Sequence, residues 1–179
     1  MKAVLILPTY NERENILTLL NGLAKAAQQI KNHTLTFLVV DDNSPDGTAR
    51  LVTQYQKTHG RVYLLTGKKQ GLGKALLRGM IYASGELGAE LLMQMDADLS
   101  HDPQAVPQFF AALDGGADFV VGSRYIPGGS IPENWGLHRK IFSIVGNAIV
   151  RFGLGYTRIH DWTGGFRLFR RHWFTAVKN

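Results

Sequence analysis

The 179-residue chain contains no cysteine, which excludes disulfide bonds, thiolate metal sites and cysteine nucleophiles. It also has no long apolar run. The apolar stretch after Lys2 ends at Pro8 and is too short for the hydrophobic region of a signal peptide. The stretch from Ile141 to Leu154 is interrupted by polar residues and is shorter than a membrane crossing. We therefore expect neither a signal peptide nor a transmembrane helix in this chain.

Charged residues are few, at 19%, whereas hydrophobic residues make up 45% of the chain, so the composition excludes a disordered tail and a coiled coil. No repeat or linker divides the sequence. We therefore expect one catalytic domain over residues 1–179. The net charge of +6 favours a polyanionic partner such as nucleic acid, an acidic membrane face or a phosphorylated ligand, although an ordinary solvated basic surface is the simpler alternative.

Short apolar runs alternate with segments of helical periodicity along most of the chain. Each run is closed by turn or polar residues, which is typical of strands buried on both faces. Because strands and helices alternate, the crossover rule predicts an α/β fold with a mostly parallel central sheet and helices on both faces. The predicted strands are Val4–Leu7, Leu35–Val40, Val62–Leu65, Leu91–Met95 and Phe119–Val121, and the predicted helices lie within 16–27, 49–56, 75–83, 106–113 and 141–152.

Polar residues directly after the strands are the first candidates for a functional site, because ligands of an open parallel sheet bind at the carboxyl ends of its strands. Asp41 and Asp42 follow the second strand. Clustered carboxylates repel one another unless a cation or hydrogen-bond donors offset their charge. Two adjacent carboxylates at a strand end therefore call for an explanation, even in a basic protein. For three neighbouring residues, helix capping and turn formation are the simpler interpretation: Asn11, Ser44 and Asp46.

Asp96 and Asp98 follow the fourth predicted strand and are two residues apart. On extended backbone this spacing puts both carboxylates on one face while Ala97 points away. Two hard oxygen ligands favour Mg²⁺ or Mn²⁺, whose remaining positions water and diphosphate oxygens would fill. The alternative is that Asp98 caps a helix begun by Pro103.

Six segments stand out when the chain is taken in order: Pro8–Asn15, Val39–Thr48, Gly71–Gly73 with Ala75 and Gly79, Asp96–His101, Gly122–Tyr125 and Asp161–Arg167. Together they resemble glycosyltransferase family 2, which has the GT-A fold, and within it the polyprenol and dolichol phosphate mannosyltransferases. The resemblance extends over nearly the whole chain and departs from the usual family pattern at Ser100, Trp162 and Gly164.

The resemblance implies an inverting, metal-dependent enzyme that moves mannose from GDP-mannose to a polyprenyl phosphate of the dolichyl type and forms a β-mannosyl phosphate lipid. It implies that Asp96 and Asp98 hold Mg²⁺ or Mn²⁺ on the donor diphosphate, and that Arg124 and Arg139 meet the acceptor phosphate. Asp98, Arg124 and Arg139 are then the expected catalytic residues. The residues expected to bind the nucleotide-sugar are Pro8, Tyr10, Glu12, Asp41, Asp42 and Asp96. For Arg139, decoration of an exposed helix start is the alternative.

By the same resemblance the enzyme works at the cytoplasmic face of a membrane, with the helix from Leu137 to Phe152 in peripheral contact with the lipid. We expect the chain to be truncated after Asn179, since relatives continue there, and either a membrane-anchoring subunit or a further membrane segment to complete the enzyme. Nucleic acid is not an expected partner, because no aromatic residues interleave with Lys and Arg on one face. Three alternatives stay open: a UDP-sugar donor such as UDP-glucose, an inactive nucleotide-binding relative, and a non-catalytic basic domain.

Overall fold

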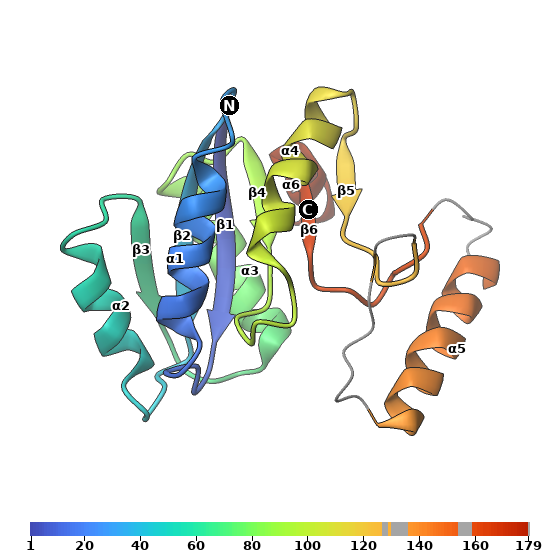
Figure 1. The fold of residues 1–179 in the computed structure, drawn as a ribbon, viewed down its shortest axis with the longest axis horizontal. Helices are drawn as coiled ribbons and strands as arrows, with labels where there is room; N and C mark the ends of the chain where they lie inside the picture. Colours follow the sequence, from blue (N-terminus) through green and yellow to red (C-terminus); the bar gives the residue numbers. More distant parts are fainter. Residues whose placement is uncertain (127–128, 130–135, 154–158, 179) are drawn as a thin grey trace.

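The computed structural model describes residues 1–126, 129, 136–153 and 159–178, which form a six-stranded sheet with helices on both faces (Figure 1). The strands are β1 Lys2–Thr9, β2 Thr34–Asp41, β3 Val62–Thr66, β4 Leu91–Gln94, β5 Phe119–Val121 and β6 Arg167–Arg170. The helices are α1 Ile16–Ala27, α2 Thr48–Gln56, α3 Leu72–Gly85, the short 3₁₀ helix η1 Pro103–Ala105, α4 Val106–Asp114, α5 Leu137–Gly153 and α6 Arg171–Lys178.

The strand order across the sheet is β3-β2-β1-β4-β6-β5. Strands β1 to β4 are parallel, whereas β6 is antiparallel to both of its neighbours, so β5 again points the same way as β1. All five predicted strands are present, and the predicted mostly parallel α/β sheet is confirmed. The apolar pattern does not predict β6, because this strand has four residues of which two are arginines at its ends.

Side chains of the central strands alternate between two apolar cores, as the period of two requires. Leu5 and Leu7 of β1 belong to the core that α1, α2 and α4 cover. Ile6 belongs to the second core, which α3 and α6 cover on the opposite face. Gly79 lets α3 lie directly on the sheet, since a Cβ there would come within 2.6 Å of Ile6 and 2.9 Å of Val40. The predicted helices on both faces are therefore confirmed.

Helix α5 differs from the other helices in its surroundings. It lies beside the sheet rather than on either of its faces (Figure 1). Large apolar side chains on it are exposed, among them Phe142 at 76%, Ile149 at 65% and Phe152 at 86%. Within the described ranges, no helix has the length and apolarity to cross a membrane.

Candidate active site

The ends of β1 and β2 meet because the two strands are parallel and in register, with Thr9 paired to Asp41. The Asp41 side chain is fully buried and accepts a hydrogen bond from the Thr9 hydroxyl at 2.9 Å. It also accepts bonds from the backbone N–H of Ser44 at 2.9 Å and from the Ser44 hydroxyl at 2.5 Å. Asp41 is thus held by donors of this chain, which offset its charge and fix the turn after β2.

The loops after β1 and β2 are tied together by hydrogen bonds from backbone N–H groups. Asn11 donates to the Ser44 hydroxyl at 3.0 Å, and Arg13 donates to the Asp46 carboxylate at 3.0 Å. Asp46 also accepts from the backbone N–H of Thr48 at 2.9 Å, at the start of α2. Burial acts to raise the pKa of Asp46, but the bonds from Thr48 and Arg13 outweigh it and lower that pKa. These bonds agree with the turn interpretation of Asn11, Ser44 and Asp46, whereas the residues that precede α1 and α2 directly are Asn15 and Gly47.

The other predicted donor-side residues gather at the same edge of the sheet. Asp42 is buried and accepts a bond from Arg78 of α3, with 2.6 Å between Nη2 and Oδ1. The Tyr10 ring is 38% exposed, and the Lys69 ammonium lies 3.3 Å from its centroid. Pro8 and Glu12 are partly buried beside them: Pro8 on β1, and Glu12 with its backbone N–H 3.1 Å from the Thr48 hydroxyl. An exposed aromatic ring with cations close by is a surface that suits a nucleotide base and its phosphates.

Asp96 and Asp98 lie just beyond β4, which ends at Gln94. Ala97 between them is buried in the core, whereas Asp96 is partly exposed and Asp98 is exposed, as expected if the carboxylates face away from the interior. Asp98 accepts a hydrogen bond from the backbone N–H of Ser100 at 3.0 Å. The helix that follows is capped by another residue, because Asp102 accepts from the Gln104 N–H at 2.8 Å. The capping alternative for Asp98 is therefore wrong.

The surroundings of Asp96 come from two other segments. A Cβ at Gly165 would lie 2.9 Å from Asp96 Oδ2, so the loop before β6 approaches this carboxylate closely, and a larger residue there would require the Asp96 side chain to move. On another side, His101 Nε2 lies 3.4 Å from the same oxygen, and its ring packs against Phe166 at 5.1 Å between centroids. The loops after β4 and before β6 therefore meet at Asp96.

Arg124 and Asp161 form a bidentate ion pair beside this carboxylate. Arg124 Nε donates to Asp161 Oδ2 at 2.7 Å, and Nη2 donates to Oδ1 at 2.8 Å. The Asp161 side chain is fully buried and also accepts from the backbone N–H of Gly164 at 3.0 Å. Burial acts to raise the pKa of Asp161, but the bonds from Arg124 and Gly164 outweigh it and lower that pKa. The bonds to Asp161, together with the nearby charge of Asp96, raise the pKa of Arg124.

The third expected catalytic residue, Arg139, is in the first turn of α5, and its side chain lies outside the described residues. The described groups that could hold a divalent cation are few. Within the ranges that the structure describes, no group of three or more His, Asp or Glu side chains is placed to bind a metal ion. Asp96 and Asp98 thus fit a hard cation whose other positions are filled by water and phosphate oxygens. They do not form an all-protein cage.

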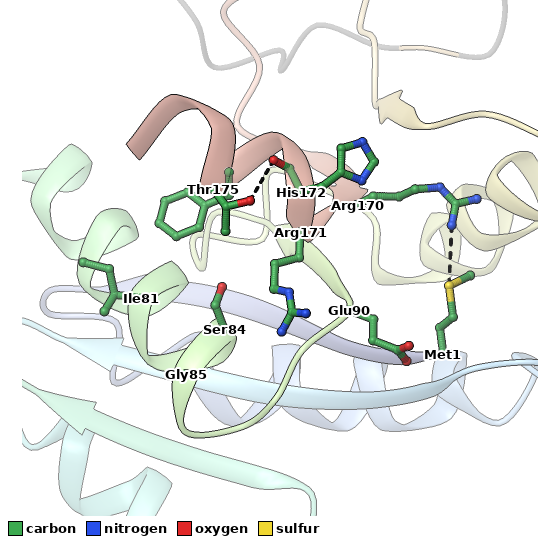
Figure 2. A pocket seen from close by; sticks show the side chains of 10 residues that line it. Met1, Ile81, Ser84, Gly85, Glu90, Arg170, Arg171, His172 and Thr175 are labelled. Carbon is green, nitrogen blue, oxygen red and sulfur yellow. Dashed lines mark hydrogen bonds between the residues drawn. The ribbon is translucent and has the colours of Figure 1, made fainter. Parts of the chain in front are cut away.

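Two hollows help to locate the reaction. One of about 490 Å³ lies between the loop after β4 and the end of β5, and His101, Ser123 and Arg124 line it. A second, of about 670 Å³, lies at the opposite edge of the sheet, where Figure 2 shows Arg171 and Glu90 among its lining side chains. The second hollow adjoins the amino ends of β1 and β4 and is therefore remote from the strand-end carboxylates. The first hollow lies on the side of the sheet where ligands of an open parallel sheet bind.

The family model described as Glycosyl transferase family 2 matches residues 4–177, nearly the whole chain. The chain belongs to glycosyltransferase family 2. The family predicted from the strand-end motifs is therefore confirmed. Among curated relatives, a polyprenol monophosphomannose synthase of Mycolicibacterium smegmatis is 40% identical over 95% of this chain and 62% of its own length. A dolichol-phosphate mannosyltransferase of Pyrococcus furiosus is 37% identical over 99% of this chain and 49% of its own. The chain thus spans about half to three fifths of these relatives.

Solved structures share the fold of this glycosyltransferase. Mannosyl-3-phosphoglycerate synthase from Rubrobacter xylanophilus aligns with a TM-score of 0.69 at 19% identity, over 97% of this chain and 55% of its own. Glucosyl-3-phosphoglycerate synthase from Mycobacterium tuberculosis, solved with Mn²⁺ and UDP, aligns with a TM-score of 0.66 at 16% identity, over 97% of this chain and 58% of its own. The mannosyltransferase PcManGT from Pyrobaculum calidifontis, solved with GDP-Man and Mn²⁺, aligns with a TM-score of 0.57 at 19% identity, over 98% of this chain and 46% of its own. These neighbours confirm the GT-A fold.

Three residues of this glycosyltransferase site have no role assigned by the sequence patterns. Asp161 stands in a motif that carries the family resemblance, but its pairing with Arg124 joins residues 37 positions apart. Arg78 belongs to none of the motifs that carry the family resemblance, yet it donates a hydrogen bond to Asp42. His101 shows no paired spacing with another histidine, and its neighbour is the Asp96 carboxylate. The periodicity of apolar residues cannot predict these contacts, because each one depends on how distant segments of the chain fold together.

Proposed function

We propose that this chain is the donor-binding and transfer part of an enzyme that moves mannose from GDP-mannose to a polyprenyl phosphate with inversion, at a cytoplasmic membrane face. The observation that carries the proposal is the loop from Asp161 to Gly165. Its first residue holds Arg124, and its last lies against Asp96. A cation suited to a lipid phosphate is therefore next to a carboxylate suited to the metal of a sugar diphosphate.

On the donor side, the edge formed by the ends of β1, β2 and β4 suits a nucleoside diphosphate sugar. Tyr10 offers a ring face for the base, and the buried pair of Asp42 and Arg78 supports the floor of the site. Asp96 and Asp98 would hold Mg²⁺ or Mn²⁺, which stabilises the departing diphosphate when bound. The remaining donor contacts in the proposal come from two residues, Pro8 and Glu12. Asp41 is buried and instead fixes the turn after β2, through its bonds from Thr9 and Ser44.

On the acceptor side, Arg124 and Arg139 would bind the lipid phosphate through planar guanidinium groups. A phosphate monoester is already anionic at neutral pH, so its oxygen can attack the anomeric carbon without a general base. In one displacement the bond from the anomeric carbon to the acceptor oxygen forms while its bond to the diphosphate oxygen breaks. The protein's contribution is then mainly positioning. A single displacement of this kind inverts the anomeric centre.

The membrane contact in the proposal is made by α5. An amphipathic helix of a globular protein normally turns its apolar stripe toward the core, but Phe142, Ile149 and Phe152 of α5 are exposed. An exposed apolar stripe of this size needs a cover. A lipid surface suits it, because the acceptor itself resides in a membrane and the chain carries a net charge of +6 that attracts anionic headgroups.

The test is a donor panel. The chain is incubated with vesicles that contain a polyprenyl phosphate, with Mn²⁺ or Mg²⁺, and in turn with GDP-mannose, UDP-glucose and UDP-N-acetylglucosamine, and the lipid products are weighed by mass spectrometry. We expect a hexosyl phosphate lipid with GDP-mannose, and GDP to compete better than UDP for the site. If only a UDP-sugar is transferred, that sugar replaces mannose as the proposed donor group. If neither GDP nor UDP binds, the proposed function is wrong.

A further inference from the structure

Helix α5 is attached to the rest of the chain in an unusual way, through polar side chains. Asn147 is buried, with 4% of its surface exposed, whereas the adjacent residues Gly146 and Ala148 are only partly buried. Its Oδ1 accepts a hydrogen bond from the backbone N–H of Trp162 at 2.6 Å, and its Nδ2 lies 3.3 Å from the hydroxyl of Thr163. One turn earlier, the Ser143 hydroxyl accepts from the hydroxyl of Tyr125 at 2.7 Å.

The contacts of Ser143 and Asn147 lead to both members of the Arg124–Asp161 ion pair. Tyr125 directly follows Arg124 in the chain, and Thr163 accepts a bond from Arg124 Nη2 at 2.9 Å. The Thr163 hydroxyl also lies 3.3 Å from Asp161 Oδ1, so it touches both members of the pair. The polar side of α5 is therefore continuous with the hydrogen bonds that hold Arg124 in place.

The apolar side of α5 faces the other way. Successive residues of an α-helix are rotated by about 100°, so Ser143 and Asn147 share one side of α5. The same rotation puts Val145, Ile149 and Phe152 on the opposite side, where all three are exposed. Asparagine is a poor helix former, so its presence in the middle of α5 is explained by these contacts and not by helix stability.

We propose that Ser143 and Asn147 are positioning residues that join the lipid-facing helix to the Arg124–Asp161 pair. Through this joint, the height at which α5 lies in the lipid surface sets the height at which Arg124 meets the acceptor phosphate. The inference rests on the proposed function for its consequence in catalysis. The joint itself is a property of the fold, and it can be measured without any transfer of sugar.

The experiment removes the joint and keeps the helix. In the double variant Ser143→Ala/Asn147→Ala both side-chain bonds to the rest of the chain are lost, while alanine favours the helix more than asparagine does. The control is Gly146→Ala on the same helix, where a Cβ meets nothing within 4 Å. Ser143→Thr, which keeps a hydroxyl, is the conservative variant.

The first readout is the distance between two spin labels on vesicle-bound protein. The chain has no cysteine, so Ala111→Cys on α4 and Gly153→Cys on α5 direct labels to these positions alone. We expect a narrow distance distribution for the parent chain and for Gly146→Ala, and a clearly broader one for the double variant. An unchanged distance distribution in the double variant would show that Ser143 and Asn147 do not join α5 to the rest of the chain, whether or not the chain transfers sugar.

The second readout separates positioning from general damage. For acceptor embedded in vesicles, the double variant should raise KM about tenfold, the loss expected for one or two side-chain hydrogen bonds. KM for a short, water-soluble isoprenyl phosphate and the Kd for GDP should stay unchanged, and Ser143→Thr, which keeps the hydroxyl, should behave nearly like the parent chain. Equal losses on both acceptors would overturn the inference. If the parent chain binds neither GDP nor UDP, the proposed function fails, and the label distances alone decide whether the joint exists.

Discussion

Asp98 is exposed and, among the described residues, accepts one hydrogen bond, from the Ser100 N–H, so its substitution should leave the fold intact. Asp98→Asn removes a full ligand charge and should weaken metal-dependent GDP binding at least about tenfold. The matched control is Asp102→Asn, an exposed carboxylate of the same loop that caps η1. Calorimetric titration of GDP with and without Mn²⁺ checks this. Unchanged metal-dependent affinity in Asp98→Asn would show that Asp98 is not a ligand.

The carboxylate of Asp161 has its pKa lowered in the folded state, since hydrogen bonds from Arg124 and Gly164 outweigh the effect of burial. A lowered pKa means that this group stabilises the fold above the pKa of the unfolded chain, about 3.9, and that the stabilisation is lost as the pH falls through the folded pKa. Asp161→Asn should cost about 3 kcal/mol of unfolding free energy at pH 7, because it leaves Arg124 partly buried beside a neutral partner.

Urea unfolding at pH 7 and at several values below pH 4 measures both effects. The loss of stability on acidification should be smaller in Asp161→Asn than in the parent chain. Asp118→Asn is the control, because Asp118 is 60% exposed and its pair with Arg170 lies at the surface. That variant should change stability by less than about 1 kcal/mol. Identical pH profiles for the parent chain and Asp161→Asn would contradict the assignment.

At the scale of elements, the exposed stripe of α5 is the part of the fold that most needs a partner. Ile149→Glu puts a charge in the middle of that stripe and should reduce binding to anionic vesicles roughly tenfold. Leu77→Glu makes the same change at an exposed residue of α3 and should leave vesicle binding as it is. Co-sedimentation with vesicles measures both. Equal effects of the two substitutions would show that α5 has no special part in the contact.

Alternation of apolar runs and helical periodicity predicts β1 to β5 and the helices between them, since these are the signals that buried strands and amphipathic helices leave in a sequence. It does not predict β6 or its antiparallel direction. A strand of four residues bounded by Arg167 and Arg170 is too short for a pattern, and it follows α5 without the usual crossover. Helix α6 begins at the next residue and lacks the preceding turn that signals a helix start.

At the scale of the whole molecule, the proposed function places the donor at the ends of β1, β2 and β4 and the acceptor at Arg124 and α5. Arg124→Ala should therefore raise the acceptor KM by roughly 100-fold, as loss of a charged, bidentate contact does, while the donor Kd changes little. Arg124→Lys should recover only part of the loss, because an ammonium group is a point charge. Arg170→Ala, at the surface pair with Asp118, is the control for loss of an arginine.

Acceptor kinetics and donor affinity are measured side by side, with the melting temperature as a check that the variants are folded. Equal losses in donor affinity and acceptor KM would show that the two sides are not separate. The sequence alone predicts which strand ends carry the site, because the topology brings them to one edge. It does not predict that Asp161 holds Arg124 or that Gly165 lies against Asp96, since both contacts depend on the path of the chain before β6.

The configuration of the product tests the central claim most directly, because it depends on donor, acceptor and the course of the displacement together. GDP-α-mannose, Mn²⁺ and a polyprenyl phosphate are incubated with the chain, and the anomeric coupling constants of the lipid product are read by NMR, with Asp98→Asn as the blank. The account predicts a β-mannosyl phosphate lipid from the parent chain and far less from the variant. An α-linked product, or mannose transferred equally well by Asp98→Asn, would contradict it.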